Sequence, residues 1–368
     1  MDIITLTQEL VRIPSESSDP VATPAAGQES GVVAFLQAMC NQAGLASEIR
    51  EALPGRHNFI TRLPNPGAPR LVIMSHMDTV SGRGMTAPFS GALARDRILG
   101  RGACDDKGPL AAALATVLAL HREKIRPVFD LTLAATVDEE CSMAGASRLA
   151  QDLDGWDLCI GLEPTALRLV HAHKGVYRFL LHTRGLAAHS SAPEHGRNAI
   201  DAMLPLLADL QDYGRELANR HDPDLGAAAL SVTRIDGGGS LNIIPDHCMA
   251  GIDIRLLPDM EPDAVEQRVR AMLADRAELE EVYRGRGIRT DLGNPLVQEF
   301  LQTLATEGLD PRPTTAAFAT DCSRMAHKGP CIVWGPGDIA QAHKLDEYIT
   351  LTQLEAAGRV LRRFLTGN

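Results

Sequence analysis

Short apolar runs alternate with helical patterns through the first half of the chain, and this alternation limits the possible folds most strongly. The segments 70–75, 129–137 and 158–162 are rich in apolar and β-branched residues, which predicts buried strands. Between the first two lies 109–124, an Ala- and Leu-rich stretch with a proline in its first turn, which predicts a helix buried nearly all round. Strands separated by helices predict an α/β fold, with a mostly parallel sheet covered by helices on both faces.

A different order of elements begins near residue 174. The residues that follow contain expected strands at 176–183, 228–235 and 248–257, and expected helices at 198–219 and 262–281. A strand, a helix, two adjacent strands and a last helix predict a small α+β insert with an antiparallel sheet.

The first pattern returns after residue 287. Helices are expected at 295–307 and 350–365, with a buried strand between them at 330–334. We therefore predict a main domain formed by residues 1–173 and 287–368, which is interrupted by an insert at 174–286.

Composition excludes several classes of protein. The chain of 368 residues has a net charge of −11, which argues against a general binder of nucleic acid or of anionic membranes. Its longest nearly apolar run, 109–120, is shorter than the ~20 residues that a membrane-spanning helix needs. The N-terminus shows no charged start leading into an apolar signal core. The seven scattered cysteines form no Cys-x-x-Cys pair, which fits reduced thiols in a cytoplasmic protein.

Histidines and carboxylates recur directly after predicted strands and in loops. They lie in His76-Met77-Asp78, in the glycine-rich segment 100–108 with Asp105 and Asp106, in Asp138-Glu139-Glu140, in Glu163-Pro164, and at His343. Each one alone has an ordinary explanation, such as a capped turn, a helix cap or a solvated loop. Because ligands bind at the carboxyl ends of parallel strands, the set together indicates a functional site.

Two imidazoles and three carboxylates, one of them shared, suit a pair of divalent ions of the zinc or cobalt type. Such a pair, ~3.5–4 Å apart, needs a bridging carboxylate, and it activates a water for attack on a carbonyl. A further carboxylate that binds no metal would move the proton from the water to the leaving nitrogen. Adjacent acids such as Glu139 and Glu140 can divide these two tasks, because successive side chains diverge.

The ordered motifs resemble the metal-dependent aminoacylase/carboxypeptidase family, which includes acetylornithine deacetylase, succinyl-diaminopimelate desuccinylase and glutamate carboxypeptidases. They are His76-x-Asp78, Gly-Arg-Gly-x-x-Asp105-x-Lys-Gly, Asp-Glu139-Glu140, Glu163-Pro-Thr and His343. The resemblance runs from Leu10–Ser15 to the C-terminal helix, which is essentially the whole chain. It implies a di-zinc exopeptidase-like catalytic domain with an inserted lid and dimerisation domain.

The resemblance also implies the ligands of two divalent ions, with Zn²⁺ favoured and Co²⁺ as the alternative. His76 and Glu163 would bind one ion, Glu140 and His343 would bind the other, and Asp105 would bridge them. Asp106 stands where the family usually has an apolar residue. The spacing of Asp105 from the Gly-Arg-Gly segment matches the family motif, so Asp105 is favoured as the bridge.

Two further residues take catalytic roles by the same resemblance. Asp78 would hydrogen-bond His76 and fix its tautomer, which tunes the ligand. Glu139 would be the general base and later the general acid.

The insert carries three more residues that match the family. The segment 185–193 resembles the lid motif, whose histidine stabilises the oxyanion in the neighbouring subunit, so His189 takes this role and a homodimer is implied. Asn242, in a glycine-rich segment that lacks the Gly-Lys-Ser/Thr of a phosphate loop, would lie near the substrate. Arg255 would bind the substrate carboxylate bidentately, and an ion pair with Asp253 or Asp259 is its structural alternative.

The substrate class follows from the resemblance of two segments. Glu163 stands where the family's aminopeptidases tend to have aspartate, and 335–348 looks most like acetylornithine and acetylcitrulline deacetylases. This implies deacetylation of an N-acetyl amino acid in arginine biosynthesis. The alternatives are a succinyl-diaminopimelate desuccinylase, then a dipeptidase or carboxypeptidase. A metal-binding regulatory protein on an inactive scaffold is a different class, and the presence of Glu139 and of all five proposed ligands argues against it.

Overall fold

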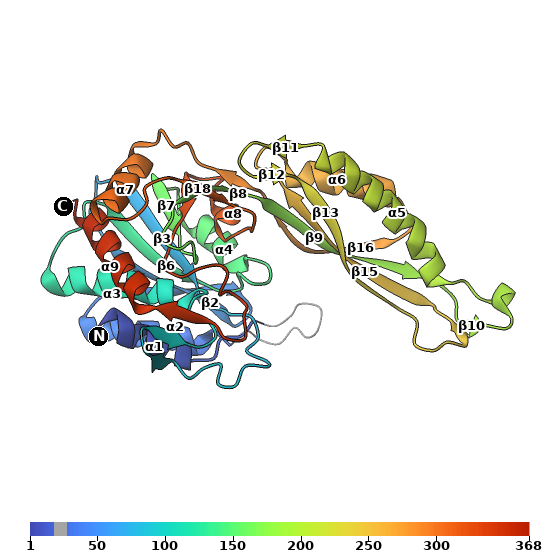
Figure 1. Ribbon diagram of the computed structural model, residues 1–368, viewed down its shortest axis with the longest axis horizontal. Helices are drawn as coiled ribbons and strands as arrows, with labels where there is room; N and C mark the ends of the chain where they lie inside the picture. The colour runs from blue at the N-terminus through green and yellow to red at the C-terminus, as the bar shows by residue number, and fades with distance from the viewer. Residues whose placement is uncertain (18–27, 368) are drawn as a thin grey trace. The chain divides into compact units, whose positions relative to one another are not determined.

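A mixed sheet forms the centre of the larger of two units in the computed structural model, which describes residues 1–17 and 28–367 (Figure 1). This unit comprises Met1–His171, Arg289–Thr314 and Thr320–Asn368. Its central strands run parallel in the order β6 (Asp130–Thr136), β3 (Arg70–His76), β7 (Leu158–Gly161) and β19 (Cys331–Val333). The predicted α/β fold with a mostly parallel sheet is confirmed.

Further strands extend the sheet on both sides of this parallel centre. On one side β2 (Arg56–Leu63) pairs with β6, and β1 (Ser47–Leu53) pairs with β2. On the other side the order continues from β19 through β8 (Val170–His173) to β17 (Ile288–Arg289), and β18 (Thr314–Ala316) pairs with β8.

Helices cover both faces of the central sheet (Figure 1). One layer contains α1 (Ile3–Arg12), α2 (Ser30–Ala43), α3 (Lys107–Glu123), α7 (Pro295–Thr306) and α9 (Leu351–Thr366), and the other contains α4 (Ala144–Asp152) and α8 (Cys322–Met325). The helix α3 is buried almost all round, as its continuous apolar sequence predicts. Its leucines pack with those of β3 and β6 in the main core.

A small sheet in the same unit joins segments that are distant in the sequence. It has the order β20 (Tyr348–Thr350), β5 (Arg97–Leu99) and β4 (Ala92–Ala94). The pairing of β20 with β5 brings the chain after His343 beside the chain before Asp105.

The second unit comprises Ala172–Ile288 and Thr315–Ala319. Its antiparallel sheet has the order β13 (Ala229–Gly237), β15 (His247–Leu256), β9 (Gly175–Arg184) and β16 (Glu278–Gly285). Helices α5 (Ala199–Ala218) and α6 (Pro262–Leu273) pack on it. Shorter elements are β10 (Ala188–His189), η1 (Pro193–His195), β11 (His221–Asp222), β12 (Gly226–Ala227) and β14 (Ile243–Ile244).

The helix predicted at 262–281 is too long by its last eight residues. The structure ends α6 at Leu273, and Ala274 then has a positive φ of 50°. Residues from Glu278 onward instead pair with β9 as the edge strand β16. Leu279 packs against the core of this unit while Glu278 and Glu280 are exposed, so a period of two replaces the helical period. Pairing with β9 therefore overrides the helix propensity of these charged residues.

The helices of the described residues can be compared with the length and apolar character of a membrane-spanning helix. None of their helices combines the length and the apolar character that crossing a membrane requires.

Candidate metal centre

Five histidine and carboxylate side chains form two overlapping groups at the carboxyl ends of the parallel strands. The first group is His76, Asp105 and Glu163, and the second is Asp105, Glu140 and His343. In each group, one potential ligand atom per residue lies within 4.8 Å of the others. Asp105 belongs to both groups, so it occupies the position that a bridging carboxylate needs.

The two oxygens of Asp105 face different imidazoles. Its Oδ1 lies 3.0 Å from Nε2 of His76, and its Oδ2 lies 3.4 Å from Nε2 of His343. The same nitrogen of His343 lies 3.1 Å from Oε1 of Glu140. Burial alone would raise the pKa of Asp105, but hydrogen bonds to His343 and His76 outweigh burial and hold this pKa below its ordinary value.

The donor set fits divalent cations. Burial raises the pKa of Glu163 well above its ordinary value, and repulsion from Glu139 and Asp105 raises it further. Burial likewise raises the pKa of Glu140. Several carboxylates in one buried place are costly unless they are protonated, paired or bound to metal. Imidazole nitrogens with carboxylate oxygens are ligands that zinc and cobalt accept, so the residues present suit such ions.

Asp105, and not its neighbour Asp106, belongs to these groups. The Asp106 side chain is fully buried, and one of its carboxylate oxygens accepts a hydrogen bond from the Ser75 hydroxyl. The loop that leads to Asp105 depends on Gly102, which has a φ of 83°. A Cβ at this position would lie only 2.8 Å from Cγ2 of Thr79, so a larger residue could not follow the same path.

Asp78 contacts both His76 and the loop that carries the two glutamates. Its backbone carbonyl lies 2.9 Å from Nδ1 of His76, whereas its carboxylate Oδ1 is 3.6 Å from the same atom. A carbonyl can only accept, so Nδ1 of His76 donates to it, while Nε2 of the same ring faces Oδ1 of Asp105. The contact of Asp78 with His76 is therefore made mainly by its backbone carbonyl, and control of the His76 tautomer stays a prediction.

The Asp78 carboxylate also orients the following acids. It is fully buried and accepts backbone N–H bonds from Glu139 at 3.0 Å and Glu140 at 3.1 Å. This contact, which the sequence did not predict, fixes the turn from which the two glutamate side chains diverge.

A buried arginine supports the same turn, and the sequence analysis missed it. Arg56, at the start of β2, bonds Glu29 through its Nε at 3.1 Å and Asp138 through a terminal nitrogen at 2.5 Å. Asp138 precedes Glu139 and has a φ of 69°, an uncommon conformation for a residue other than glycine. The three charges lie 27 and 82 positions apart in sequence, so no local pattern indicates that they meet.

The three predicted residues of the insert lie in the second unit. There β10 pairs with β14, so His189 lies opposite Ile243, and the N–H of Ser190 donates to the carbonyl of Asn242 at 3.0 Å. The structure thus brings the His189 and Asn242 segments together. Arg255 instead bonds Asp253, with Nε 2.7 Å from Oδ1. This is the structural alternative that the sequence left open, and a role for Arg255 in substrate binding stays a prediction.

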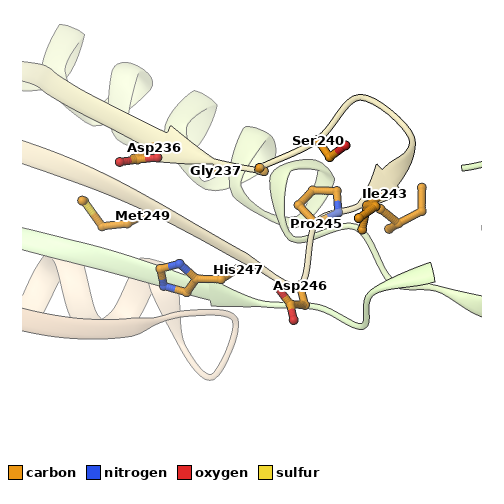
Figure 2. A pocket seen from close by; sticks show the side chains of 11 residues that line it. Asp236, Gly237, Ser240, Ile243, Pro245, Asp246, His247 and Met249 are labelled. Atoms are coloured by element: carbon orange, nitrogen blue, oxygen red, sulfur yellow. The ribbon is translucent and has the colours of Figure 1, made fainter. Parts of the chain in front are cut away.

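A hollow of about 560 Å³ lies in the second unit, beside the loop that carries Asn242. Figure 2 shows Gly237 and Ser240 on the chain that leaves β13, and Pro245, Asp246 and His247 on the chain that enters β15. None of the residues that line this hollow belongs to the two groups of potential ligands around Asp105.

A model of peptidase family M20/M25/M40 matches residues 72–367, most of the chain. The chain belongs to this family. The resemblance inferred from the motifs is therefore confirmed, and the family identifies the protein as a metallohydrolase that acts on amide bonds.

Relatives of known name match over nearly the whole length of this M20 protein. The acetylornithine deacetylase of Aliivibrio fischeri is 29% identical, covering 97% of this chain and 96% of its own. That of Edwardsiella ictaluri is 30% identical, with 94% and 92% covered. A peptidase M20 domain-containing protein of Schizosaccharomyces pombe is 29% identical, with 96% and 81% covered.

Solved structures show the same fold. A metallo-carboxypeptidase of Sulfolobus solfataricus has a TM-score of 0.80 at 19% identity, covering 100% of this chain and 99% of its own. A dinuclear metal-binding peptidase of Bacillus subtilis has a TM-score of 0.68 at 16% identity, with 99% and 96% covered.

Proposed function

We propose that this protein is a metal-dependent deacylase that removes the acetyl group from an N-acetyl amino acid such as N-acetylornithine, as a step of arginine biosynthesis. One observation carries the chemistry: Asp105 is shared by two groups of potential ligands, and Glu139, which interacts electrostatically with His76 and Glu163, belongs to neither group. The relatives named acetylornithine deacetylase support the substrate class.

The proposed ligands divide between two cations. His76, Asp105 and Glu163 would hold one, and Asp105, Glu140 and His343 would hold the other, with zinc favoured and cobalt as the alternative. When bound, such ions lower the pKa of a water molecule and polarise the amide carbonyl.

Glu139 is proposed to move the proton. Burial raises its pKa well above the ordinary value, and repulsion from Glu140 raises it further. In its ionised form this carboxylate can accept the proton of the attacking water, and the carboxyl so formed can return it to the leaving amine. The Asp78 carboxylate accepts the backbone N–H groups of both residues, so it would fix the position of the base Glu139 relative to the proposed ligand Glu140.

The insert, residues 174–286, is proposed to act as a lid and dimerisation domain. In this proposal His189 stabilises the oxyanion in the partner subunit, while Asn242 and Arg255 bind the substrate. The second unit exposes several large apolar side chains, namely Leu186, Leu204, Ile235, Leu241 and Ile243. The strand β13 also lies at one edge of its sheet. Exposed apolar groups and an open strand edge favour association with another copy.

A substrate panel tests the proposal. The protein with added zinc or cobalt is assayed on N-acetylornithine, N-acetylcitrulline, N-acetylmethionine, N-succinyl-diaminopimelate and a dipeptide with a free amino terminus. We expect the acetylated amino acids to be hydrolysed with the largest kcat/KM. Preference for the succinyl compound would favour a desuccinylase. Turnover of the dipeptide alone would favour a peptidase, the second candidate, which the Schizosaccharomyces pombe relative supports.

A further inference from the structure

A buried ion pair lies between the loops that carry the proposed ligands. Arg101 and Glu347 are 2% and 1% exposed, and a terminal nitrogen of Arg101 lies 2.6 Å from Oε2 of Glu347. Arg101 precedes Asp105 in the glycine-rich loop, and Glu347 follows His343. The pair thus connects the chain segment that carries Asp105 with the segment that carries His343.

The other oxygen of Glu347 holds the backbone at Asp105. Its Oε1 accepts the N–H of Cys104 at 2.9 Å and the N–H of Asp105 at 3.1 Å. A single carboxylate therefore accepts three hydrogen bonds from the loop, and two of its donors are peptide groups flanking Cys104. Because these peptides fix where the Asp105 side chain begins, Glu347 orients the carboxylate that belongs to both groups.

Arg101 extends this connection to a third loop. Its Nε donates to the carbonyl of Ser81 at 3.3 Å, in the loop that follows His76 and Asp78. The backbone reinforces the same junction, because the N–H of Gly100 donates to the carbonyl of Glu347 at 3.1 Å. The segments of His76, Asp105 and His343 therefore converge on one buried pair of charges.

We propose that Glu347 is a positioning residue, which sets Asp105 between the two cation sites and fixes the segment of His343 to the same loop. This inference rests on the proposed function, because it concerns the affinity of that centre for its ions. It assigns Glu347 no contact with substrate or with the reacting atoms.

The substitution Glu347→Gln tests this role with little change in shape. The amide oxygen can still accept the two N–H bonds, but the amide nitrogen faces Arg101 with a donor where an acceptor is needed. We expect the dissociation constant for Co²⁺ to rise about 10–100-fold, as for other partners that orient metal ligands. It is measured by calorimetric titration of the metal-free protein, at a temperature where circular dichroism shows the variant folded. Excess Co²⁺ should restore part of the turnover that is lost at limiting Co²⁺.

A matched control is Glu307→Gln. Glu307 also pairs with arginines, namely Arg359 and Arg363 of α9, and the substitution removes the same charge. We expect it to leave Co²⁺ affinity unchanged. Should Glu347→Gln fail to fold, Glu347→Asp keeps the charge while shortening the side chain, and it should weaken Co²⁺ binding in the same direction.

Two results would overturn the inference in distinguishable ways. A folded Glu347→Gln variant with a lowered melting temperature but unchanged Co²⁺ affinity would make Glu347 a stabilising residue only. A wild-type protein that binds no Co²⁺ would overturn the proposed function and this inference together.

Discussion

Adjacent residues have different surroundings in this centre. Glu139 and Glu140 both follow β6, and the Asp78 carboxylate accepts both of their N–H groups. Only Glu140 reaches His343, with a separation of 3.1 Å. The sequence could indicate this division because side chains of successive residues diverge. It could not indicate that Asp78 holds the turn, because that contact depends on how two separate strands lie side by side.

The pair of glutamates gives a prediction at this scale. Glu139→Ala should retain both metal ions and lose about 10²–10⁴-fold in kcat, the usual contribution of a general base. Glu140→Ala should instead lose affinity for one ion. Metal content by atomic absorption, together with kcat on N-acetylornithine, separates the two. Loss of metal from Glu139→Ala, or full activity in it, would contradict the assignment.

Elements were predicted well where the signal is local. The strands of the central sheet and the helix α3 follow from continuous apolar runs, and those runs are buried in the structure. The strand β16 was missed because its charged residues have a helical composition and become a strand only by pairing with β9. Arg56 was missed for a related reason, since its contacts join β2, the start of α2 and the loop after β6.

The substitution Arg56→Met tests this junction between elements. It leaves Glu29 and Asp138 buried without their cation, which should cost about 3–5 kcal/mol of unfolding free energy. Burial raises the pKa of Glu29, and Arg56 opposes that rise. Without Arg56 the pKa of Glu29 should rise further, so the folded state of the variant favours the protonated form of Glu29. The loss of stability should therefore be larger at about pH 8 than at about pH 5.

Urea unfolding at both pH values measures this effect. Arg148→Met is the control, because Arg148 forms an exposed pair with Asp152 within α4 and should contribute little. Equal losses for the two variants, or a loss that grows as the pH falls, would contradict the interpretation.

At the scale of the whole molecule, the order of the motifs predicted the family, and the family match confirms it. The α/β alternation predicted the sheet on which the candidate centre is built. Other contacts join residues too far apart for any pattern in the chain, such as those between Glu347 and Asp105, which are 242 positions apart. The proposed homodimer also concerns the whole molecule, because in this proposal His189 of one subunit acts at the metal centre of the other.

Complementation between inactive variants tests that assignment. His189→Ala should retain its metal and lose about 10²–10³-fold in kcat, as expected when an oxyanion donor is removed. Mixed dimers of His189→Ala with Glu139→Ala contain one site with both residues intact. Because both variants keep the same symmetric interface, random pairing makes about half of the dimers mixed. Each mixed dimer has one intact site of two, so about a quarter of wild-type activity should return. No recovery in verified mixed dimers would place His189 in its own subunit's site or outside catalysis.

The central claim is that Asp105 lies between two cations held by five side chains. A crystal structure of the cobalt-loaded protein, with anomalous data collected above and below the cobalt edge, tests it most directly. We predict two anomalous peaks ~3.5–4 Å apart, one beside His76 and Glu163 and the other beside Glu140 and His343, with Asp105 contacting both. A single peak, or peaks away from Asp105, would contradict the account.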